Sequence, residues 1–148
     1  MAVHTENRKA RFDFEILEPF EAGIELFGFE VKAVKANRIN LEGSYVFPRL
    51  GALWLVGATI APYQANNTPE GYDQTRERKL LLHKKEIDYL LGKFSTKGLT
   101  ILPMRVYDKG ARVKIEIAVA HKRKVYDKRE RTKERETDRT ISRTLKEI

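Results

Sequence analysis

The sequence of 148 residues predicts a mainly β protein: a closed antiparallel β-barrel of about six strands, with one to three helices and a basic C-terminal tail. Three observations support this class. Apolar residues recur at every second position in several runs, pairs of such runs meet at glycine-containing turns, and the composition changes abruptly after Ala120. The length allows one compact domain and a tail.

The N-terminal third contains one alternating run and two shorter segments. Residues 8–17 alternate between apolar and charged side chains, which predicts a half-buried strand. Residues 19–28 hold two glycines and a proline, so we expect a bend or a bulge there. Residues 29–36 fit a short helix or a strand, and we favour the helix.

The middle of the chain predicts a hairpin followed by a loop. Residues 44–50 and 52–60 are rich in β-forming residues and meet at Gly51. Residues 61–74 have no apolar period and contain two prolines, two asparagines and a glycine, which is typical of a loop. Residues 78–83 form either a strand or the lead-in to a helix.

The next apolar period is helical. Ile87, Leu90, Leu91 and Phe94 share one helix face, which predicts an amphipathic helix from residue 84 that ends before Gly98. Residues 99–107 and 111–120 predict a second hairpin, joined at residues 108–110. An OB-like barrel would remove the exposed edges of such a sheet, although a half-open sandwich fits the pattern almost as well.

Residues 122–148 form a tail with a composition of its own. They hold 11 Lys/Arg and 6 Asp/Glu, a net charge of +5, and few large apolar side chains. Such a segment buries too little apolar surface to offset its ordering entropy, so we expect it to be disordered in the free protein. The predicted organisation is a barrel over residues 1–121 and a tail over residues 122–148. Wound as a helix, the tail would align one column of arginines suited to a polyanion: Arg131, Arg135, Arg139 and Arg143.

Charge and cysteine content narrow the function classes. The 29 Lys and Arg residues against 21 Asp and Glu give a net charge of +8, which favours a polyanionic partner such as nucleic acid. The absence of cysteine excludes disulfides and thiolate zinc sites. The sequence has neither a signal-peptide core nor an apolar run of about 18 residues. We therefore expect a cytoplasmic protein that does not bind membranes.

Basic clusters, rather than catalytic motifs, stand out along the chain. The histidines lie in separate segments, and neither a phosphate loop nor a nucleophile elbow occurs, so we expect no catalytic residue, no metal and no cofactor. Lysines and arginines cluster at residues 8–11, 76–79, 83–85 and 121–124. Each cluster alone is equally consistent with a solvated surface, whereas clusters gathered at one rim of the barrel would bind phosphates.

Six motifs follow one another along nearly the whole chain. They are Asn7-Arg8-Lys9-Ala10, FEAGIEL (20–26) with GFEVK (28–32), IAPY (60–63), RERKLLLHK (76–84), GLT (98–100) and YDKR (126–129). Together they make the chain resemble the bacterial SsrA-binding protein family, also called the small protein B family.

The resemblance implies an RNA-binding adaptor. Its OB-like barrel would bind the tRNA-like domain of transfer-messenger RNA (SsrA) and deliver that RNA to a stalled 70S ribosome for trans-translation. The tail would enter the vacant decoding site and the mRNA channel, where it meets small-subunit rRNA. Through the RNA, the partners extend to elongation factor Tu and alanyl-tRNA synthetase. We expect a monomer.

The resemblance also assigns site residues by position. Asn7, Glu21 and Leu81 match positions associated with the elbow of the RNA, although Glu21 could be an ordinary surface carboxylate and Leu81 a core residue. The expected contacts to the tRNA-like domain are Asn7, Arg8, Lys9, Glu21, Arg78, Lys79, Leu81, His83 and Lys84. The expected ribosome contacts of the tail are Arg123, Lys124, Tyr126, Asp127, Lys128, Arg129, Lys133, Arg135, Arg139, Arg143 and Leu145.

Two other functions remain open at this stage. A general translation or ribosome-assembly factor with an OB-like body would share the composition and differ in its RNA preference, because it would bind rRNA. A nuclease would need a metal or acid–base cluster that the motifs do not supply.

Overall fold

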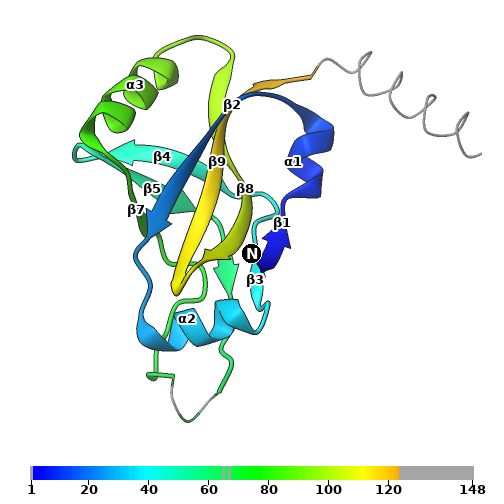
Figure 1. The fold of residues 1–148 in the computed structure, drawn as a ribbon, viewed down its shortest axis with the longest axis vertical. Coiled ribbons are helices and arrows are strands. Elements are labelled where there is room, and N and C mark those ends of the chain that lie inside the picture. The colour runs from blue at the N-terminus through cyan, green and yellow to red at the C-terminus, as the bar shows by residue number, and fades with distance from the viewer. Residues whose placement is uncertain (1, 65, 67, 124–148) are drawn as a thin grey trace, which may run out of the picture.

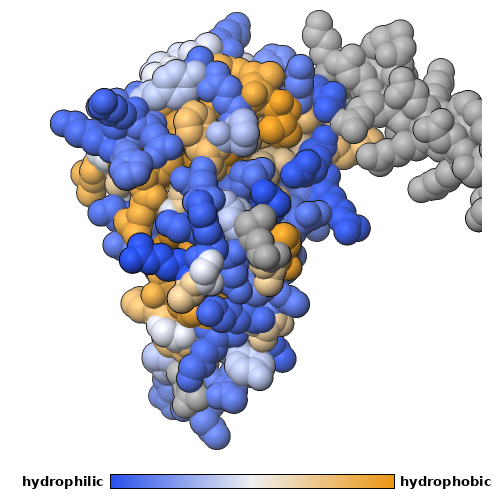
Figure 2. All heavy atoms as spheres, viewed as in Figure 1, coloured by the Kyte–Doolittle hydropathy of each residue, from blue (hydrophilic) through white to orange (hydrophobic). Residues whose placement is uncertain are grey.

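The computed structural model describes residues 2–64, 66 and 68–123 and shows a mainly β fold with three helices (Figure 1). The strands are β1 (Val3–Glu6), β2 (Phe14–Ile24), β3 (Ile39–Asn40), β4 (Tyr45–Arg49), β5 (Ala52–Val56), β6 (Thr59–Ile60), β7 (Arg78–Leu81), β8 (Leu99–Lys109) and β9 (Arg112–Lys122). The helices are α1 (Arg8–Asp13), α2 (Gly28–Lys35) and α3 (Lys84–Phe94). Hydrophilic side chains cover most of the visible surface, with apolar patches between them (Figure 2).

Seven antiparallel strands form one curved sheet in the order β1-β8-β9-β2-β7-β5-β4, and β3 pairs with β6 in a second, small sheet. The mainly β class is confirmed, but the predicted closure is not seen. In the part of the chain that the structure describes, no ladder joins β4 to β1 or β8, although β4 lies beside β8. Helix α1 flanks this open seam, because its buried Ala10 packs with Leu102 and Met104 of β8.

Helix α1 corrects the strand predicted for residues 8–17, whose first half is helical. Asn7 caps the helix, because its Oδ1 accepts a hydrogen bond of 3.2 Å from the N–H of Ala10. The backbone N–H of Asn7 donates to the Met104 carbonyl at 2.8 Å, which fixes the cap against β8. The alternating pattern becomes a strand only from Phe14 onward.

Strand β2 corrects the bend expected over residues 19–28. It continues through Pro19 to Ile24, and its irregularity lies earlier, between Ile16 and Glu18. Pro19 lies opposite Ala118 of β9, whereas the pairing of β2 with β7 begins only at Gly23. At Pro19 the strand therefore has one ladder partner, which is the edge-like position that proline tolerates.

The remaining predicted elements are confirmed with small changes. Helices α2 and α3 and the hairpins at residues 50–51 and 110–111 lie where the sequence places them. The run over residues 52–60 is divided at Gly57, whose φ of 86° interrupts it between β5 and β6. Residues 78–83 combine both alternatives, because β7 ends at Leu81 and His83 is the N-cap of α3. Strand β9 extends to Lys122, beyond the predicted domain boundary.

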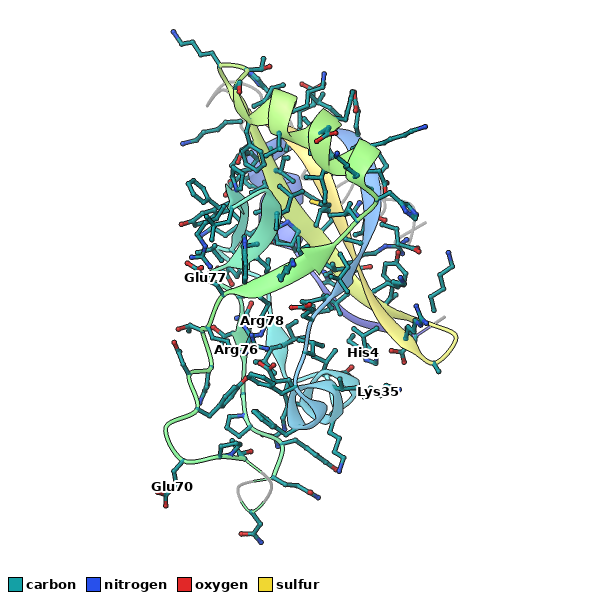
Figure 3. All side chains as sticks on the ribbon, turned by 90° about the vertical axis from the view of Figure 1, so that its left-hand side faces the viewer. His4, Lys35, Glu70, Arg76, Glu77 and Arg78 are labelled. Atoms are coloured by element: carbon teal, nitrogen blue, oxygen red, sulfur yellow. The ribbon has the colours of Figure 1, made fainter. Side chains whose placement is uncertain are left out.

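A buried ion-pair network joins α2 to β7 and to the loop before it (Figure 3). The side chains of Glu30 and Arg78 are fully buried, and Arg78 donates from Nη2 and Nε to Glu30 Oε2 at 2.7 and 3.0 Å. Arg76 and the Tyr72 hydroxyl also donate to this carboxylate. The remaining Arg78 donors reach the backbone carbonyls of Ala58, Arg76 and Gln74. The network is thus extensively hydrogen-bonded, as buried charges require.

The network keeps Glu30 ionised. Burial alone would raise the pKa of the carboxyl group, but hydrogen bonds from Arg76, the Phe27 N–H, Tyr72 and Arg78 outweigh burial and hold the pKa below 4.5. Burial and the adjacent Glu30 carboxylate raise the pKa of Tyr72 to about 12, so its hydroxyl remains a donor.

Replacing Glu30 with glutamine should strongly destabilise the fold. Glu30→Gln leaves the buried guanidinium of Arg78 without its counter-charge, and breaking a buried ion pair in this way costs about 3–5 kcal/mol. Urea unfolding at pH 7 measures the loss, and Glu25→Gln, at an exposed position, is the matched control.

The same pair of variants has a distinct acid dependence. Because the folded pKa of Glu30 lies below 4.5, its stabilisation is complete above pH 4.5 and is lost as the pH falls through the folded value. The free energy of unfolding of Glu30→Gln should therefore fall less steeply with acid than that of the parent. Equal stability at pH 7, or an unchanged acid slope, would contradict the role of this network.

Candidate nucleic-acid interface

A hollow of about 300 Å³ lies at the outer surface where β2, β7 and β9 meet. It brings together three of the predicted site residues, Glu21, Leu81 and His83, with Gly23 and Lys114. A neighbouring hollow of about 250 Å³ shares Gly23, Leu81 and Lys114 and continues toward the β8–β9 turn. Leu81 therefore borders both hollows, and residues distant in sequence form one surface.

Leu81 is exposed because β7 alternates strictly. Arg78 and Leu80 point into the protein, whereas Lys79 and Leu81 point outward, and 48% of Leu81 is exposed. Gly23 lies opposite Leu81 in the ladder, and a Cβ atom on Gly23 would lie 3.2 Å from Leu81 Cβ. The glycine thus provides the space in which Leu81 lies across β2. The alternative role of Leu81 as a core residue does not hold.

Glu21 is a charged acceptor at the rim of the hollow. Its carboxylate accepts hydrogen bonds from the Tyr107 hydroxyl at 2.6 Å and from Lys109 Nζ at 3.1 Å. These two hydrogen bonds lower the pKa of Glu21 below 4.5 despite partial desolvation. Burial and the Glu21 carboxylate raise the pKa of Tyr107 to about 12. Glu21 therefore stays ionised at neutral pH, and its carboxylate is held in place from one side.

Cationic side chains lie in and beside the hollow, and Lys109 and Lys114 are the two that act on the Glu21 carboxylate. Lys114 lines both hollows, and Lys79 is half-buried on the outer face of β7. His83 and Lys84 are exposed at the start of α3, where the His83 N–H donates to Glu86 Oε1 at 3.3 Å. The Glu86 side chain thereby caps the backbone of His83 at the start of the helix, and His83 lines the hollow. The surface can bind phosphates at its border and hydrogen-bond donors at Glu21.

Two predicted site residues are not at the surface, which corrects their expected role in direct contact. Asn7 is 4% exposed, and its Nδ2 donates to the Pro103 carbonyl at 2.9 Å. Arg78 is fully enclosed in the Glu30 network. Both are structural: Asn7 positions α1 and Arg78 positions β7.

The basic clusters do not all gather at one rim, the arrangement that a closed sheet would have allowed. Arg8 and Lys9 are exposed on α1, which precedes the Phe14 end of β2, whereas the hollow lies at the Gly23 end. The start of β2 is instead joined to the end of β9, where Arg123 Nε donates to the Phe14 carbonyl at 3.2 Å. The other predicted tail contacts, from Lys124 to Leu145, lie outside the described residues.

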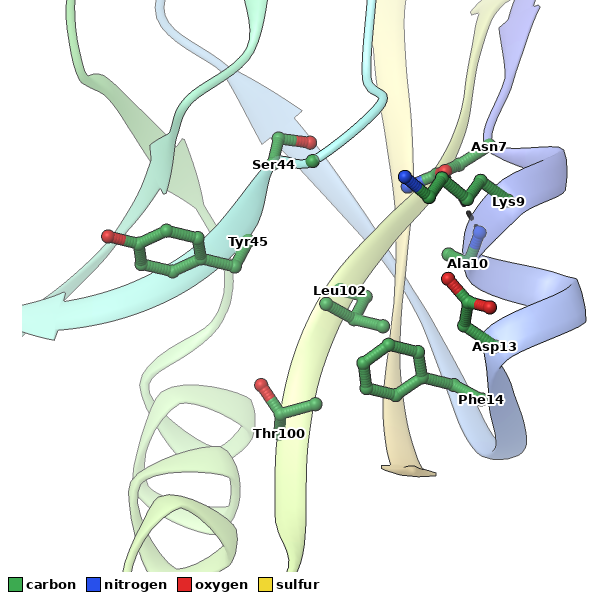
Figure 4. A pocket seen from close by; sticks show the side chains of 10 residues that line it. Asn7, Lys9, Ala10, Asp13, Phe14, Ser44, Tyr45, Thr100 and Leu102 are labelled. Carbon is green, nitrogen blue, oxygen red and sulfur yellow. Dashed lines mark hydrogen bonds between the residues drawn. The ribbon is translucent and has the colours of Figure 1, made fainter. Parts of the chain in front are cut away.

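A further cavity, of about 360 Å³, lies at the open seam between α1, β4 and β8 (Figure 4). Phe14, Tyr45 and Leu102 give it apolar walls, and Lys9 extends over it from α1. Lys9 is also 3.7 Å from Glu42, an exposed pair that holds it only weakly.

The described residues supply no group of three or more histidine, aspartate or glutamate side chains that could hold a metal ion. None of the described helices is long and apolar enough to cross a membrane.

Sequence patterns could not identify every residue of the interface. Lys109, Lys114 and Tyr107 join it through the pairing of β2 with β9 and of β9 with β8. The alternating pattern of residues 111–120 shows which side chains share a face, but it does not show which neighbours they meet.

Comparisons with known proteins match this chain to one protein family over nearly its whole length. The family model described as SmpB protein matches residues 4–147. The SsrA-binding protein of Gloeothece citriformis (strain PCC 7424) is 48% identical over 142 residues, covering 96% of this chain and 92% of that protein. The SsrA-binding protein of Rubrobacter xylanophilus is 50% identical over 148 residues, covering 99% and 97%. A solved chain described as "tmRNA-SmpB: a journey to the center of the bacterial ribosome" superposes with a TM-score of 0.69 at 42% identity, covering 84% of this chain and 87% of that one.

Adding one methyl group at Gly23 should disturb Leu81. In Gly23→Ala the new Cβ is too close to Leu81 Cβ, and overpacking of this kind costs about 1–3 kcal/mol unless Leu81 moves. The measurement is the chemical shift of the Leu81 methyl groups by NMR, together with the free energy of unfolding.

The matched control is Gly92→Ala, because nothing lies within 4 Å of a Cβ at this helical position. It should stabilise the protein by about 0.5–1 kcal/mol. Unchanged Leu81 shifts in Gly23→Ala would show that the glycine does not seat this side chain.

Proposed function

The chain belongs to the SmpB family, and on this premise we propose that it binds the tRNA-like domain of transfer-messenger RNA and delivers that RNA to stalled ribosomes. The observation that carries the proposal is the hollow where Glu21, Leu81 and His83 converge. The protein acts as an RNA-binding adaptor rather than an enzyme, in the bacterial cytoplasm where ribosomes translate. The alternative of a general rRNA-binding assembly factor is not favoured by the family match.

The chemistry of the hollow suits an RNA loop. Structured RNA is recognised largely through unpaired loops, whose bases expose both their edges and their faces. The Glu21 carboxylate can accept hydrogen bonds from the amino groups of base edges. Phosphates have no donor group to offer it. Leu81 offers an exposed apolar contact for a base or a ribose. Lys79, His83, Lys84 and Lys114 would contact the phosphates around the loop.

The basic surface of α1 supplies additional contacts to the backbone of the RNA. Arg8 and Lys9 are exposed, as phosphate-binding side chains must be. Their distance along β2 from the hollow suits an extended RNA that crosses more than one face of the protein. Asn7 contributes indirectly, because it holds the start of α1 through its hydrogen bonds.

The tail is assigned to the ribosome. Residues 122–148 carry a net charge of +5, which suits the vacant decoding site and the mRNA channel, both of them lined by rRNA. Tyr126 offers a ring for stacking on a base, and the basic residues from Lys128 to Arg143 offer phosphate contacts. The tail would thereby sense whether the channel is empty, while the folded β domain holds the transfer-messenger RNA.

The folded β domain should discriminate between related RNAs. We expect it to prefer the tRNA-like domain over an ordinary tRNA of equal size, and the preference should persist as salt rises, because base and shape contacts do not depend on counterion release. Leu81→Ser should weaken this binding by about tenfold, since burying the exposed half of a leucine side chain against the RNA is worth about 1.4 kcal/mol.

A competition titration at several salt concentrations measures both effects. Leu17→Ser is the control, because Leu17 is 45% exposed, close to the 48% of Leu81, and lies outside the hollow. Equal and steeply salt-dependent affinities for both RNAs would contradict the proposal and indicate a general RNA binder.

Removal of the tail should separate binding from rescue. A chain that ends after Arg123 keeps β9 and its contact with Phe14, so its affinity for the tRNA-like domain should change little. Release of stalled ribosomes in a reconstituted translation assay should be lost. Rescue by the truncated chain at the parent rate would overturn the role given to the tail.

A further inference from the structure

We propose that the outer face of the β4–β5 hairpin is a second RNA-binding surface, on which unpaired nucleobases stack. We define the hairpin face as Tyr45, Phe47 and Arg49 of β4, Trp54 of β5 and Lys79 of β7. The cross-strand partners Phe47, Trp54 and Lys79 lie in one row across the three strands. This inference goes beyond the function proposed above, because the aromatic rings of the hairpin face lie outside the hollow and only Lys79 is shared with the contacts proposed there.

The hairpin face exposes large aromatic rings on a rigid support. Along β4, Val46 is buried in the core, whereas Tyr45 and Phe47 on either side of it are 43% and 54% exposed. Figure 2 shows apolar side chains at the surface on the left-hand side of the molecule, where Figure 1 draws β4, β5 and β7. Aromatic rings at such exposure are available to a partner without rearrangement of the core.

Trp54 and Arg49 are held in place before any ligand arrives. The Trp54 Nε1–H donates to the Arg49 carbonyl at 3.1 Å, and the Arg49 guanidinium lies 4.5 Å from the centre of the Trp54 ring. Glu77 forms an ion pair with the same guanidinium. The Arg49 guanidinium is held by Glu77 and lies over the indole of Trp54, so the pair presents a flat surface for a further ring.

The turn of the hairpin adds an unusual leucine. Leu50 is 94% exposed and has a φ of 52°, a conformation that bulky side chains rarely adopt. The Leu50 side chain therefore does not pack in the core. The apolar surface of the hairpin therefore continues beyond the end of β4, where Leu50 can contact the ribose or the face of a terminal base.

Charge favours RNA as the occupant. Arg49 and Lys79 are the cations of the face, and the adjacent carboxylate of Glu77 is already paired with Arg49. Surfaces that bind single-stranded RNA typically combine exposed aromatic rings with cations, because bases stack on the rings while phosphates contact the charges. The net charge of +8 for the chain acts in the same direction over longer range.

Pairing with another protein strand is disfavoured at this edge. Strand β4 ends the seven-stranded sheet, but Pro48 lacks an N–H group and interrupts its row of donors. A strand from a second copy of the chain or from an extended peptide would therefore pair with β4 through an incomplete set of backbone hydrogen bonds. Stacking on the face does not need that edge.

The fluorescence of Trp54 tests the proposal directly, because Trp54 is the one tryptophan of the chain. Full-length protein is titrated with a single-stranded oligoadenylate of about eight nucleotides, the length range of one such binding site. The comparison is a blunt RNA duplex of the same length, whose bases are not free to stack. We expect saturable quenching by the single strand and at least about tenfold weaker quenching by the duplex.

Two variants locate the effect. Phe47→Ala keeps Trp54 and should weaken single-strand quenching by roughly tenfold, the loss expected for one stacked base. Phe27→Ala is the control, because Phe27 is 53% exposed but stacks with Arg76 and Phe29 away from the hairpin, and it should leave the quenching unchanged. Thermal unfolding of both variants verifies that they are folded.

The outcomes also separate this proposal from the function of the hollow. Phe47→Ala should retain parent affinity for the tRNA-like domain, and Leu81→Ser should retain the Trp54 quenching. Absent quenching, equal quenching by the duplex, or an unaffected Phe47→Ala variant would overturn the proposal. A Trp54 blue shift that grows with protein concentration without RNA would also overturn it, since it would identify the face as a contact between copies of the chain.

Discussion

The buried pair of Glu30 and Arg78 is the constraint on which the arrangement of the functional surfaces depends. Arg78 must point inward to reach the carboxylate on α2, and side chains along a strand alternate. Lys79 and Leu81 therefore point outward. A slip of β7 by one residue would bury a lysine and expose the arginine and Leu80, which the network forbids energetically. The same pair fixes α2 against the end of the loop that leads into β7, so one ionic contact sets both the register of a central strand and the position of a helix.

That register links the two surfaces we assign to RNA. The outer face of the sheet runs from Tyr45 and Phe47 on β4, through Trp54 and Lys79, to Leu81, and then to the Gly23–Lys114 pair of β2 and β9. The inner face of the same strands forms the main hydrophobic core. Because side chains along each strand point alternately to the outer and the inner face, the outward residues can serve RNA binding while the inward residues maintain the core.

The sequence predicts those elements whose signals are local. Helix α3 and both hairpins follow from apolar period and turn residues, and these are confirmed. Helix α1 and the continuation of β2 were missed because they depend on distant partners: the Met104 carbonyl that fixes the Asn7 cap, and the missing second neighbour of β2 at Pro19. At the site, Glu21 and Leu81 came from family resemblance rather than from physical pattern. Arg78 was misjudged because a basic cluster does not reveal which of its members has a buried counter-ion, here 48 residues away.

In the proposed complex, the carboxylate of Glu21 would give the interface selectivity and would lower its affinity for the RNA backbone. Tyr107 and Lys109 keep it ionised and fixed, so in the proposed complex it would repel a phosphate that enters the hollow and would accept hydrogen bonds from base amino groups. Lysines alone would bind every RNA backbone in a salt-dependent manner. A fixed negative charge among them excludes the backbone from one position and admits the edge of an unpaired base there. Two effects would therefore discriminate between RNAs. A phosphate placed beside Glu21 is disfavoured by like charge, and a base amino group placed there is favoured because its donors and the carboxylate satisfy each other. An adaptor that must distinguish one structured RNA among abundant tRNAs needs this difference more than it needs tight binding.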